Sequence, residues 1–268
     1  LINDEDFPLL NRATQGLYAP GSVFKMVPAS AALQEGVIHE DTLINCPGRY
    51  KLGSHTFRCW KRGGHGWMNL RLAIINSCDV YFYKLAESLG IDRLSKYMKA
   101  FGYGDYTGIG IEERKGVAPS REWKRERFNK PWYSGETIVS AIGQGYVSTS
   151  PLQVAMMTAA IANNGHLYKP MMVRKIVPSL GDEIIHSEPE THENLNIEGE
   201  ILEKIREAMT AVVNQPGGTG RRAMIPDYTV AGKTGTAQVV SLDRRGSHRK
   251  HEDHAWFTAY APAGAPEI

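Results

Sequence analysis

The residues with the clearest chemical potential are a serine and a lysine three positions apart, Ser22 and Lys25. A Pro-Gly pair precedes Ser22, and an apolar run, 23–33, follows it directly. This pattern predicts a buried helix that begins at Ser22 and stops at Gly36. Because three residues are nearly one helical turn, we expect the Lys25 amine to lie within reach of the Ser22 hydroxyl.

This arrangement is suited to nucleophilic catalysis. A serine hydroxyl is a weak nucleophile at neutral pH and needs a base beside it. The N-terminus of a helix supplies N–H groups and a partial positive charge, which stabilise an oxyanion and disfavour a proton on a nearby lysine. A buried lysine with a lowered pKa can accept the serine proton. The pair therefore indicates Ser22 as nucleophile and Lys25 as its base.

Two further motifs distinguish this pair from a chance match. The S-x-x-K pattern is expected about once by chance in a chain of this length, and a second match, Ser247-His248-Arg249-Lys250, lies in a charged stretch with no apolar helix behind it. The accompanying motifs are Ser77-Cys78-Asp79 and Lys233-Thr234-Gly235-Thr236. The order and spacing of three motifs are far more specific than any one of them.

The remaining pattern predicts the elements that must position these motifs. Helices are expected at 70–75, 80–90, 91–101, 151–163 and 200–213. Short strand pieces are expected within 37–66 and 167–198, and two longer antiparallel strands at 228–240 and 255–261. The predicted fold class is therefore mixed α/β.

A basic segment, 102–131, is expected to be loop-rich. A solvated face is favoured there over a binding patch. The basic side chains concerned are Arg121, Lys124, Arg125, Arg127 and Lys130.

The composition limits the number of domains and the kinds of partner that the chain can have. A chain of 268 residues with 42% hydrophobic content can bury one substantial core or two small ones, and no linker or repeat divides it, so we expect one domain, 1–268. The net charge of +2 does not call for a nucleic-acid partner. No run of about eighteen apolar residues is present. The first residues are neither a signal peptide nor a methionine start, so we expect a piece of a longer protein whose membrane anchor lies elsewhere.

The three motifs resemble the set found in penicillin-recognising serine acyltransferases, that is, penicillin-binding proteins and serine β-lactamases. Nearly the whole chain is similar to the transpeptidase domain of the penicillin-binding protein 2 family, the class B, monofunctional enzymes of rod-shape elongation. The stretches that carry this similarity include Asn11-Arg12-Ala13, Trp60-Lys61, Gly64-His65-Gly66, Phe101-Gly102-Tyr103-Gly104, Arg121-Glu122-Trp123-Lys124, Lys130-Pro131-Trp132-Tyr133 and Gly143-Gln144-Gly145-Tyr146. The resemblance implies a penicillin-binding/serine β-lactamase-like fold, a helical lobe plus an antiparallel sheet, truncated here at both ends, with the family's membrane helix and pedestal domain outside this chain.

The activity that this resemblance implies is peptidoglycan D,D-transpeptidation during cell elongation. Ser22 would attack a stem peptide ending in D-Ala-D-Ala, and an amine of a neighbouring stem would then take the acyl group. β-Lactams would be covalent inhibitors, and no catalytic cofactor is expected. The implied location is the periplasmic side of the bacterial inner membrane. Membrane proteins of the elongation machinery would be partners through regions outside this chain.

The resemblance also implies a role for each motif residue. Lys25 would be the base for Ser22, and Ser77 would relay the proton toward the leaving group. Lys233 would lower the pKa of Lys25 and attract the substrate carboxylate. The expected catalytic residues are thus Ser22, Lys25, Ser77, Asp79 and Lys233, and the expected substrate-binding or oxyanion residues are Thr234, Gly235 and Thr236.

One residue departs from the common family pattern. Many relatives have asparagine as the third residue of the middle motif, whereas this chain has Asp79. An aspartate adds an acceptor charge and loses an amide donor. Elongation-type enzymes tolerate aspartate there, so we interpret it as a mark of that subfamily.

The three cysteines of the chain and one histidine form a candidate metal site, Cys46, Cys59, His65 and Cys78. Cys₃His is a standard tetrahedral zinc set, although no C-x-x-C pair is present. The segment has few apolar residues and many turns, so a metal could hold it together. We expect structural zinc. The alternatives are a Cys46–Cys59 disulfide with Cys78 buried, in keeping with an extracytoplasmic location, and three unlinked thiols.

Other functions stay open at the level of sequence. A β-lactam-sensing or scaffold module would acylate without transferring, and a D,D-carboxypeptidase would use water as acceptor. A class A β-lactamase usually carries E-x-x-L-N, and Glu193-Asn194-Leu195-Asn196 is one residue short of it and is expected in a polar loop. The histidines of segment 248–254 are interpreted as part of a hydrated loop beside the cleft rather than a second metal site.

Overall fold

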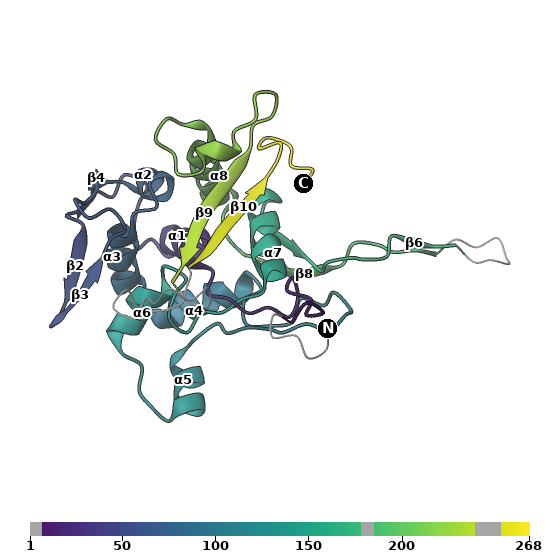
Figure 1. The fold of residues 1–268 in the computed structure, drawn as a ribbon, viewed down its shortest axis with the longest axis horizontal. Helices are drawn as coiled ribbons and strands as arrows, with labels where there is room; N and C mark the ends of the chain where they lie inside the picture. Colours follow the sequence, from purple (N-terminus) through teal and green to yellow (C-terminus); the bar gives the residue numbers. More distant parts are fainter. Residues whose placement is uncertain (1–6, 178–184, 239–252) are drawn as a thin grey trace.

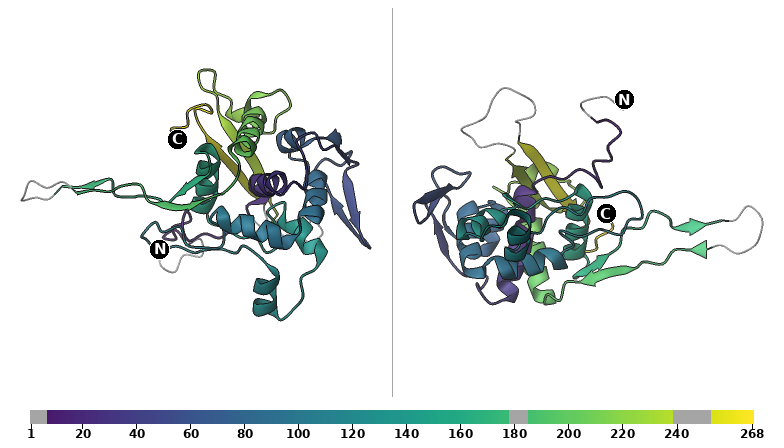
Figure 2. Two further views of the ribbon diagram at one scale, coloured as in Figure 1. Left: turned by 180° about the vertical axis from the view of Figure 1, so that it is seen from behind. Right: turned by 90° about the horizontal axis from the view of Figure 1, so that it is seen from below.

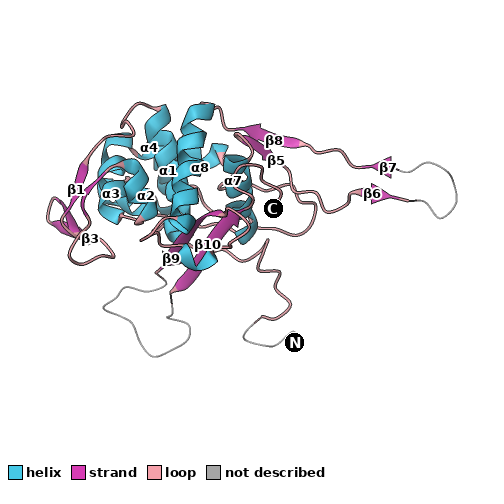
Figure 3. Cartoon of the chain, turned by 90° about the horizontal axis from the view of Figure 1, so that it is seen from above, coloured by secondary structure: helices cyan, strands magenta, loops and turns pink. Residues whose placement is uncertain are grey.

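The computed structural model describes residues 7–177, 185–238 and 253–268. Helices gather around one central helix, and a two-stranded antiparallel sheet lies against them (Figure 1, Figure 3). The helices are η1 (Gly21–Lys25), α1 (Met26–Gln34), α2 (Leu70–Ile75), α3 (Asp79–Leu89), α4 (Ile91–Ala100), α5 (Arg121–Phe128), α6 (Ser134–Ser140), α7 (Pro151–Ala162), α8 (Gly199–Asn214) and η2 (Arg221–Ala223). No helix in these ranges is both long and apolar enough to cross a membrane.

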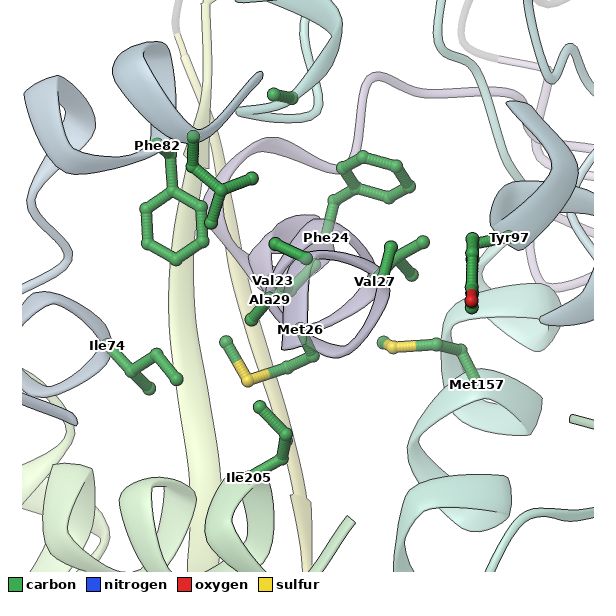
Figure 4. Close-up of a cluster of buried hydrophobic side chains, with 14 of the residues drawn as sticks. Val23, Phe24, Met26, Val27, Ala29, Ile74, Phe82, Tyr97, Met157 and Ile205 are labelled. Atoms are coloured by element: carbon green, nitrogen blue, oxygen red, sulfur yellow. The ribbon is translucent and has the colours of Figure 1, made fainter. Parts of the chain in front are cut away.

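The central helix is the one predicted after Ser22. It begins as a tight 3₁₀ turn, η1, and continues as α1, and every residue from 23 to 32 is buried. Side chains of α2, α3, α4, α7 and α8 surround it (Figure 4). Because residues 23–32 are buried on every side, the helix is packed by neighbouring elements all round. The motif with Ser22 and Lys25, which begins this helix, is therefore fixed in place by the packing at the centre of the core.

The sheet consists of β9 (Ala231–Ala237) and β10 (His254–Tyr260). Their antiparallel register pairs Lys233 with Thr258 and Gly235 with Trp256. Strand β9 packs against η1 and α8. The two strands expected near the C-terminus are thus confirmed: β9 lies within the expected range 228–240, and β10 is shifted by one residue from 255–261.

The remaining strands form short hairpins away from this sheet. Strands β1 (Ile44–Cys46), β2 (Arg49–Leu52), β3 (His55–Arg58) and β4 (Gly66–Met68) pair as β1–β4 and β2–β3. Strands β5 (His166–Tyr168), β6 (Lys175–Ile176), β7 (Ile185–His186) and β8 (Thr191–Asn194) pair as β5–β8 and β6–β7. The β6–β7 pair lies far from the helices, at the end of a long arm (Figure 2).

The loop expected over 102–131 contains a helix, α5, and α6 follows it. The signal that was missed is the cap: the Ser120 hydroxyl accepts a hydrogen bond from the Trp123 N–H at 3.0 Å. The α5 sequence shows no apolar periodicity, because its exposed side chains are mostly charged.

The expectation of a solvated basic face is also wrong for Lys124. Its side chain is 2% exposed and forms an ion pair with Glu136. The rings of Trp132, Tyr133 and Tyr146 surround the ammonium at 4.4–5.9 Å. A buried cation held by a carboxylate and by aromatic faces joins α5 to α6.

The Glu136→Gln variant tests this ion pair. It keeps the acceptor for the Tyr133 N–H but leaves the Lys124 charge buried without its partner. We expect a loss of about 3 kcal/mol in the free energy of unfolding, measured by chemical denaturation. The matched control is Asp92→Asn, which breaks the exposed Arg121–Asp92 pair and should cost less than about 1 kcal/mol. Equal losses in the two variants would contradict the structural role of the buried pair.

Candidate active site

Ser22 lies in η1, and a glycine sets its distance from strand β9. Gly21 has φ +57, and a Cβ at this position would lie 2.4 Å from the carbonyl oxygen of Thr236. A Cβ at Gly235 would likewise lie 3.1 Å from the Val23 nitrogen. Two positions without side chains therefore let the backbones of η1 and β9 approach each other closely.

The three sequence motifs line one cleft of about 850 Å³. It lies between η1, the α2–α3 connection and β9, with the β3 hairpin end and the 142–145 loop at its rim. The motif residues that line it are Ser22, Ser77, Asp79, Thr234, Gly235 and Thr236. Segments more than two hundred positions apart in the chain are thus brought to one place, as the motif order predicts.

Lys25 is fully buried and is directed to the middle motif. Its Nζ lies 2.7 Å from Asp79 Oδ1, 3.0 Å from the Ser77 carbonyl oxygen and 3.3 Å from Ser77 Oγ. In the part of the chain that the structure describes, no hydrogen bond joins Lys25 to the Ser22 hydroxyl. The amine therefore contacts the charge of Asp79 and the hydroxyl of Ser77 at the same time.

The middle motif has an unusual backbone. Ser77 connects α2 to α3 with φ +52, in the left-handed region that serine adopts at an energetic cost. The N–H of Cys78 donates to the Ala73 carbonyl at 2.9 Å and closes the end of α2. Asp79 then begins α3, so its side chain and that of Ser77 leave a tight turn in fixed directions.

Lys233 is a second fully buried lysine, on β9. Its Nζ donates to the Thr234 carbonyl oxygen at 2.8 Å. Burial first, and the nearby Lys25 charge second, hold the pKa of Lys233 well below its usual range, while Asp79 acts in the opposite direction. Two lysines thus face one carboxylate in the interior.

Three cleft residues were not singled out for a role from the sequence. Gln144 donates from Nε2 to the Thr236 carbonyl oxygen at 3.3 Å, and the Thr234 hydroxyl donates to Thr219 Oγ1 at 2.8 Å. Trp60 also lines the cleft. The Gly-Gln-Gly pattern is a turn signal that could have indicated Gln144, whereas nothing local indicates Thr219.

The four candidate metal ligands come together beside the cleft. Side-chain donor atoms of Cys46, Cys59, His65 and Cys78 all lie within 4.8 Å of one another. His65 Nδ1 is 3.6 Å from Cys46 Sγ and 3.5 Å from Cys59 Sγ. All three cysteines are buried and free, so the Cys46–Cys59 disulfide considered above is not formed.

This geometry fits a tetrahedral zinc ion. Zn–S bonds of about 2.3 Å and Zn–N bonds of about 2.0–2.1 Å, at tetrahedral angles, separate sulfur from nitrogen by about 3.6 Å. The two sulfur–nitrogen distances of the cluster match this value. Three thiols and an imidazole are also the donor set that zinc prefers.

Several other candidate residues lie elsewhere. The second S-x-x-K match, 247–250, and the histidines at 248 and 251 fall outside the described residues. His254 begins β10 and contacts the Tyr18 ring edge-to-face at 5.0 Å. Glu193 lies in β8 and not in the expected polar loop, and it does not line the cleft.

Comparisons with known proteins agree with this geometry. Residues 2–268 match the family model described as the penicillin binding protein transpeptidase domain. The peptidoglycan D,D-transpeptidase MrdA of Haemophilus influenzae is 43% identical over 279 aligned residues, covering 100% of this chain but 42% of that protein. The chain thus spans less than half the length of this curated relative.

Two solved structures have the same fold. Penicillin-binding protein 2 (PBP2) of Pseudomonas aeruginosa in complex with WCK 5153 superimposes with a TM-score of 0.87 at 38% identity, over 100% of this chain and 58% of that one. A complex between PBP2 and MreC from Helicobacter pylori gives a TM-score of 0.85 at 36% identity, over 100% of this chain and 47% of that one.

The lowered pKa of Lys233 predicts a pH-dependent stability. The native state releases this proton at a pH where the unfolded chain, with a lysine pKa of about 10.4, still holds it. The native state then binds fewer protons, so stability rises as the pH increases from the lowered native pKa to about 10.4. Across this window we expect the wild type to gain stability relative to Lys233→Met.

Denaturant unfolding of both proteins at several pH values in that window measures the difference. Lys130→Met, which removes an exposed ammonium, is the matched control. A difference between wild type and Lys233→Met that did not change with pH would contradict the buried, destabilised ammonium.

Proposed function

Since the chain belongs to the family of penicillin-binding protein transpeptidase domains, we propose that it is a serine D,D-transpeptidase domain that cross-links peptidoglycan stem peptides through a Ser22 acyl-enzyme. The observation that carries the proposal is the buried Lys25 amine, which contacts both Ser77 and Asp79, two residues that line one cleft with Ser22 and β9. The role in cell elongation is proposed on the similarity to MrdA and PBP2.

The first step forms an ester. Ser22 Oγ attacks the carbonyl carbon of the penultimate D-Ala, and Lys25, acting as the neutral amine, takes the hydroxyl proton. Ser77 Oγ, 3.3 Å from Lys25 Nζ, passes its proton to the departing D-Ala amine and takes the former Ser22 proton from Lys25 in return. In the second step an amine of another stem attacks the ester carbonyl, and Ser22 regains its proton.

The β9 side of the cleft holds the substrate in this proposal. The hydroxyls of Thr234 and Thr236, which line the cleft, bind the terminal carboxylate, and the Lys233 amine, buried behind them on the same strand, attracts it when protonated. The N–H groups of Ser22 and Thr236 receive the developing oxyanion, and Gly235 keeps the strand close to η1. A single oxyanion-hole donor contributes about 3–4 kcal/mol to such a barrier.

The proposed location and partners follow the relatives. The H. pylori relative is described in complex with MreC, so we propose that a full-length protein of this type acts with elongation-machinery membrane proteins. The active domain would lie on the periplasmic side of the inner membrane, where its peptidoglycan substrate is found. β-Lactams would acylate Ser22 because they mimic the D-Ala-D-Ala end.

The cysteine–histidine cluster is proposed to hold a structural zinc ion. Cys46, Cys59, His65 and Cys78 would be its ligands, and their distances support the assignment. The zinc would cross-link the β1–β4 region to the start of α3, because Cys78 directly precedes Asp79. The proposed reaction uses no catalytic cofactor.

Acylation tests the proposed function directly. Intact mass spectrometry after incubation with benzylpenicillin is expected to show one adduct, which peptide mapping places on Ser22. Ser22→Ala should form none, whereas Ser247→Ala, which disrupts the other S-x-x-K match, should react as the wild type does. An adduct that persists in Ser22→Ala would disprove the assignment. Incubation with a D-Ala-D-Ala peptide and an acceptor amine separates a transpeptidase from a carboxypeptidase or a sensor.

The zinc content of the wild type and of ligand variants tests the metal site. The purified chain is expected to contain about one zinc per molecule by elemental analysis, and Cys46→Ser should lose most of it and melt at a lower temperature. The matched control is His55→Gln, an exposed histidine of the same region, which should keep the metal. A protein that is purified without zinc and takes up none on incubation with a zinc salt would rule the site out.

A further inference from the structure

We infer that Trp60 is a positioning residue for the reaction. Its backbone and indole N–H groups hold Ser77 and Asp79 of the middle motif in the positions in which they contact Lys25. This inference rests on the proposed function. It concerns a residue of the cleft that does not belong to any of the three motifs.

The backbone N–H of Trp60 fixes one side of the Asp79 carboxylate. It donates to Asp79 Oδ2 at 2.9 Å, while Lys25 Nζ lies 2.7 Å from the other oxygen, Oδ1. Each carboxylate oxygen thus has a separate donor on a separate segment of the chain. Rotation of the carboxylate would break both hydrogen bonds, so Trp60 keeps Oδ1 directed at Lys25.

The indole N–H of Trp60 holds the strained turn that carries Ser77. Its Nε1 lies 3.1 Å from the Asn76 carbonyl oxygen and 3.1 Å from the Ser77 carbonyl oxygen. Ser77 has a left-handed backbone, which a serine keeps only where its surroundings impose it. The Ser77 carbonyl accepts from Lys25 as well, so the indole and the ammonium hold the same peptide from two directions.

The proposed zinc cluster in turn fixes Trp60. The residue follows Cys59 directly, and its ring lies edge-to-face against His65 with 5.3 Å between ring centroids. The Cys59 N–H donates to the Gly48 carbonyl at 2.9 Å, which anchors the start of this segment. Trp60 therefore links the cysteine–histidine cluster to the residues that are proposed to move protons.

Hydrophobic burial does not account for a tryptophan here. Trp60 is 59% exposed, about as exposed as Trp67 on β4 at 64%. In the described part of the chain, Trp67 donates no side-chain hydrogen bond, whereas Trp60 makes bonds through both of its N–H groups. The two tryptophans differ in their hydrogen bonds and not in their exposure. The role of Trp60 therefore lies in its N–H donors, and Trp67 is a matched control.

The Trp60→Phe variant removes the indole donor and keeps both an aromatic ring and the backbone N–H. We expect the rate constant of Ser22 acylation by benzylpenicillin to fall roughly fivefold to tenfold, as for loss of one hydrogen bond to a catalytic element. The dissociation constant of the complex that precedes acylation should change little. Rapid-quench mass spectrometry at several penicillin concentrations separates the two constants.

Trp60→His provides a rescue. The imidazole Nε2 occupies the ring position of the indole Nε1, so it can donate to the same carbonyl groups. We expect its acylation rate constant to lie nearer to the wild-type value than that of Trp60→Phe. Trp67→Phe should match the wild type. Zinc content and melting temperature, measured on every variant, are expected to stay at wild-type values.

Three results would overturn the inference. Trp60→Phe could acylate as fast as the wild type, which would make the indole donor irrelevant. Trp60→Phe and Trp60→His could both lose zinc and melting temperature together with rate, and the role would then be one of general stability. Absence of any adduct on wild-type Ser22 would overturn the proposed function itself, a result that is distinct from the first two.

Discussion

Lys25 and Lys233 are both fully buried, and a buried ammonium is unfavourable unless an opposite charge lies beside it. Asp79 is the carboxylate beside Lys25, at 2.7 Å, and it also favours the charged form of Lys233, although burial and Lys25 still hold the pKa of Lys233 well below its usual range. The turn at Ser77, the start of α3 and the N–H of Trp60 all serve to place that carboxylate. The position of one side chain therefore constrains three separate segments of the fold.

Aspartate in place of the asparagine that many relatives carry has a physical consequence. An asparagine amide could offer Lys25 only one neutral acceptor oxygen, and its NH₂ group would face the Trp60 N–H, a donor against a donor. With Asp79, both oxygens accept. The chain thus uses the carboxylate to satisfy an ammonium and a backbone donor at once, which an amide in the same position cannot do.

The sequence predicted the elements whose signals are local. The helix after Ser22, the helices expected at 70–75 and 151–163 and the two long strands are all confirmed, to within a few residues. The sequence did not predict α5, because its charged residues carry no periodicity, or the burial of Lys124, because its partner Glu136 is twelve positions away.

The site was only partly predictable, because some of its contacts join residues that are distant in the sequence. Residue types and spacing were enough to single out the three motifs and the cysteine–histidine set, because each has a chemical signature. The contacts of Trp60 with Asn76, Ser77 and Asp79 span sixteen to nineteen positions. They depend on how one hairpin region packs against the α2–α3 connection, and no local pattern encodes that packing.

Gly21 limits how the cleft can change during evolution. Any side chain there would place its first carbon 2.4 Å from the Thr236 carbonyl oxygen and would separate η1 from β9. A change in the size of ligand that the cleft admits must therefore come from the side chains that line it, such as Arg58 and Tyr83. The spacing between Ser22 and β9 therefore tolerates no side chain at position 21, whereas the side chains that line the cleft can change in size without altering that spacing.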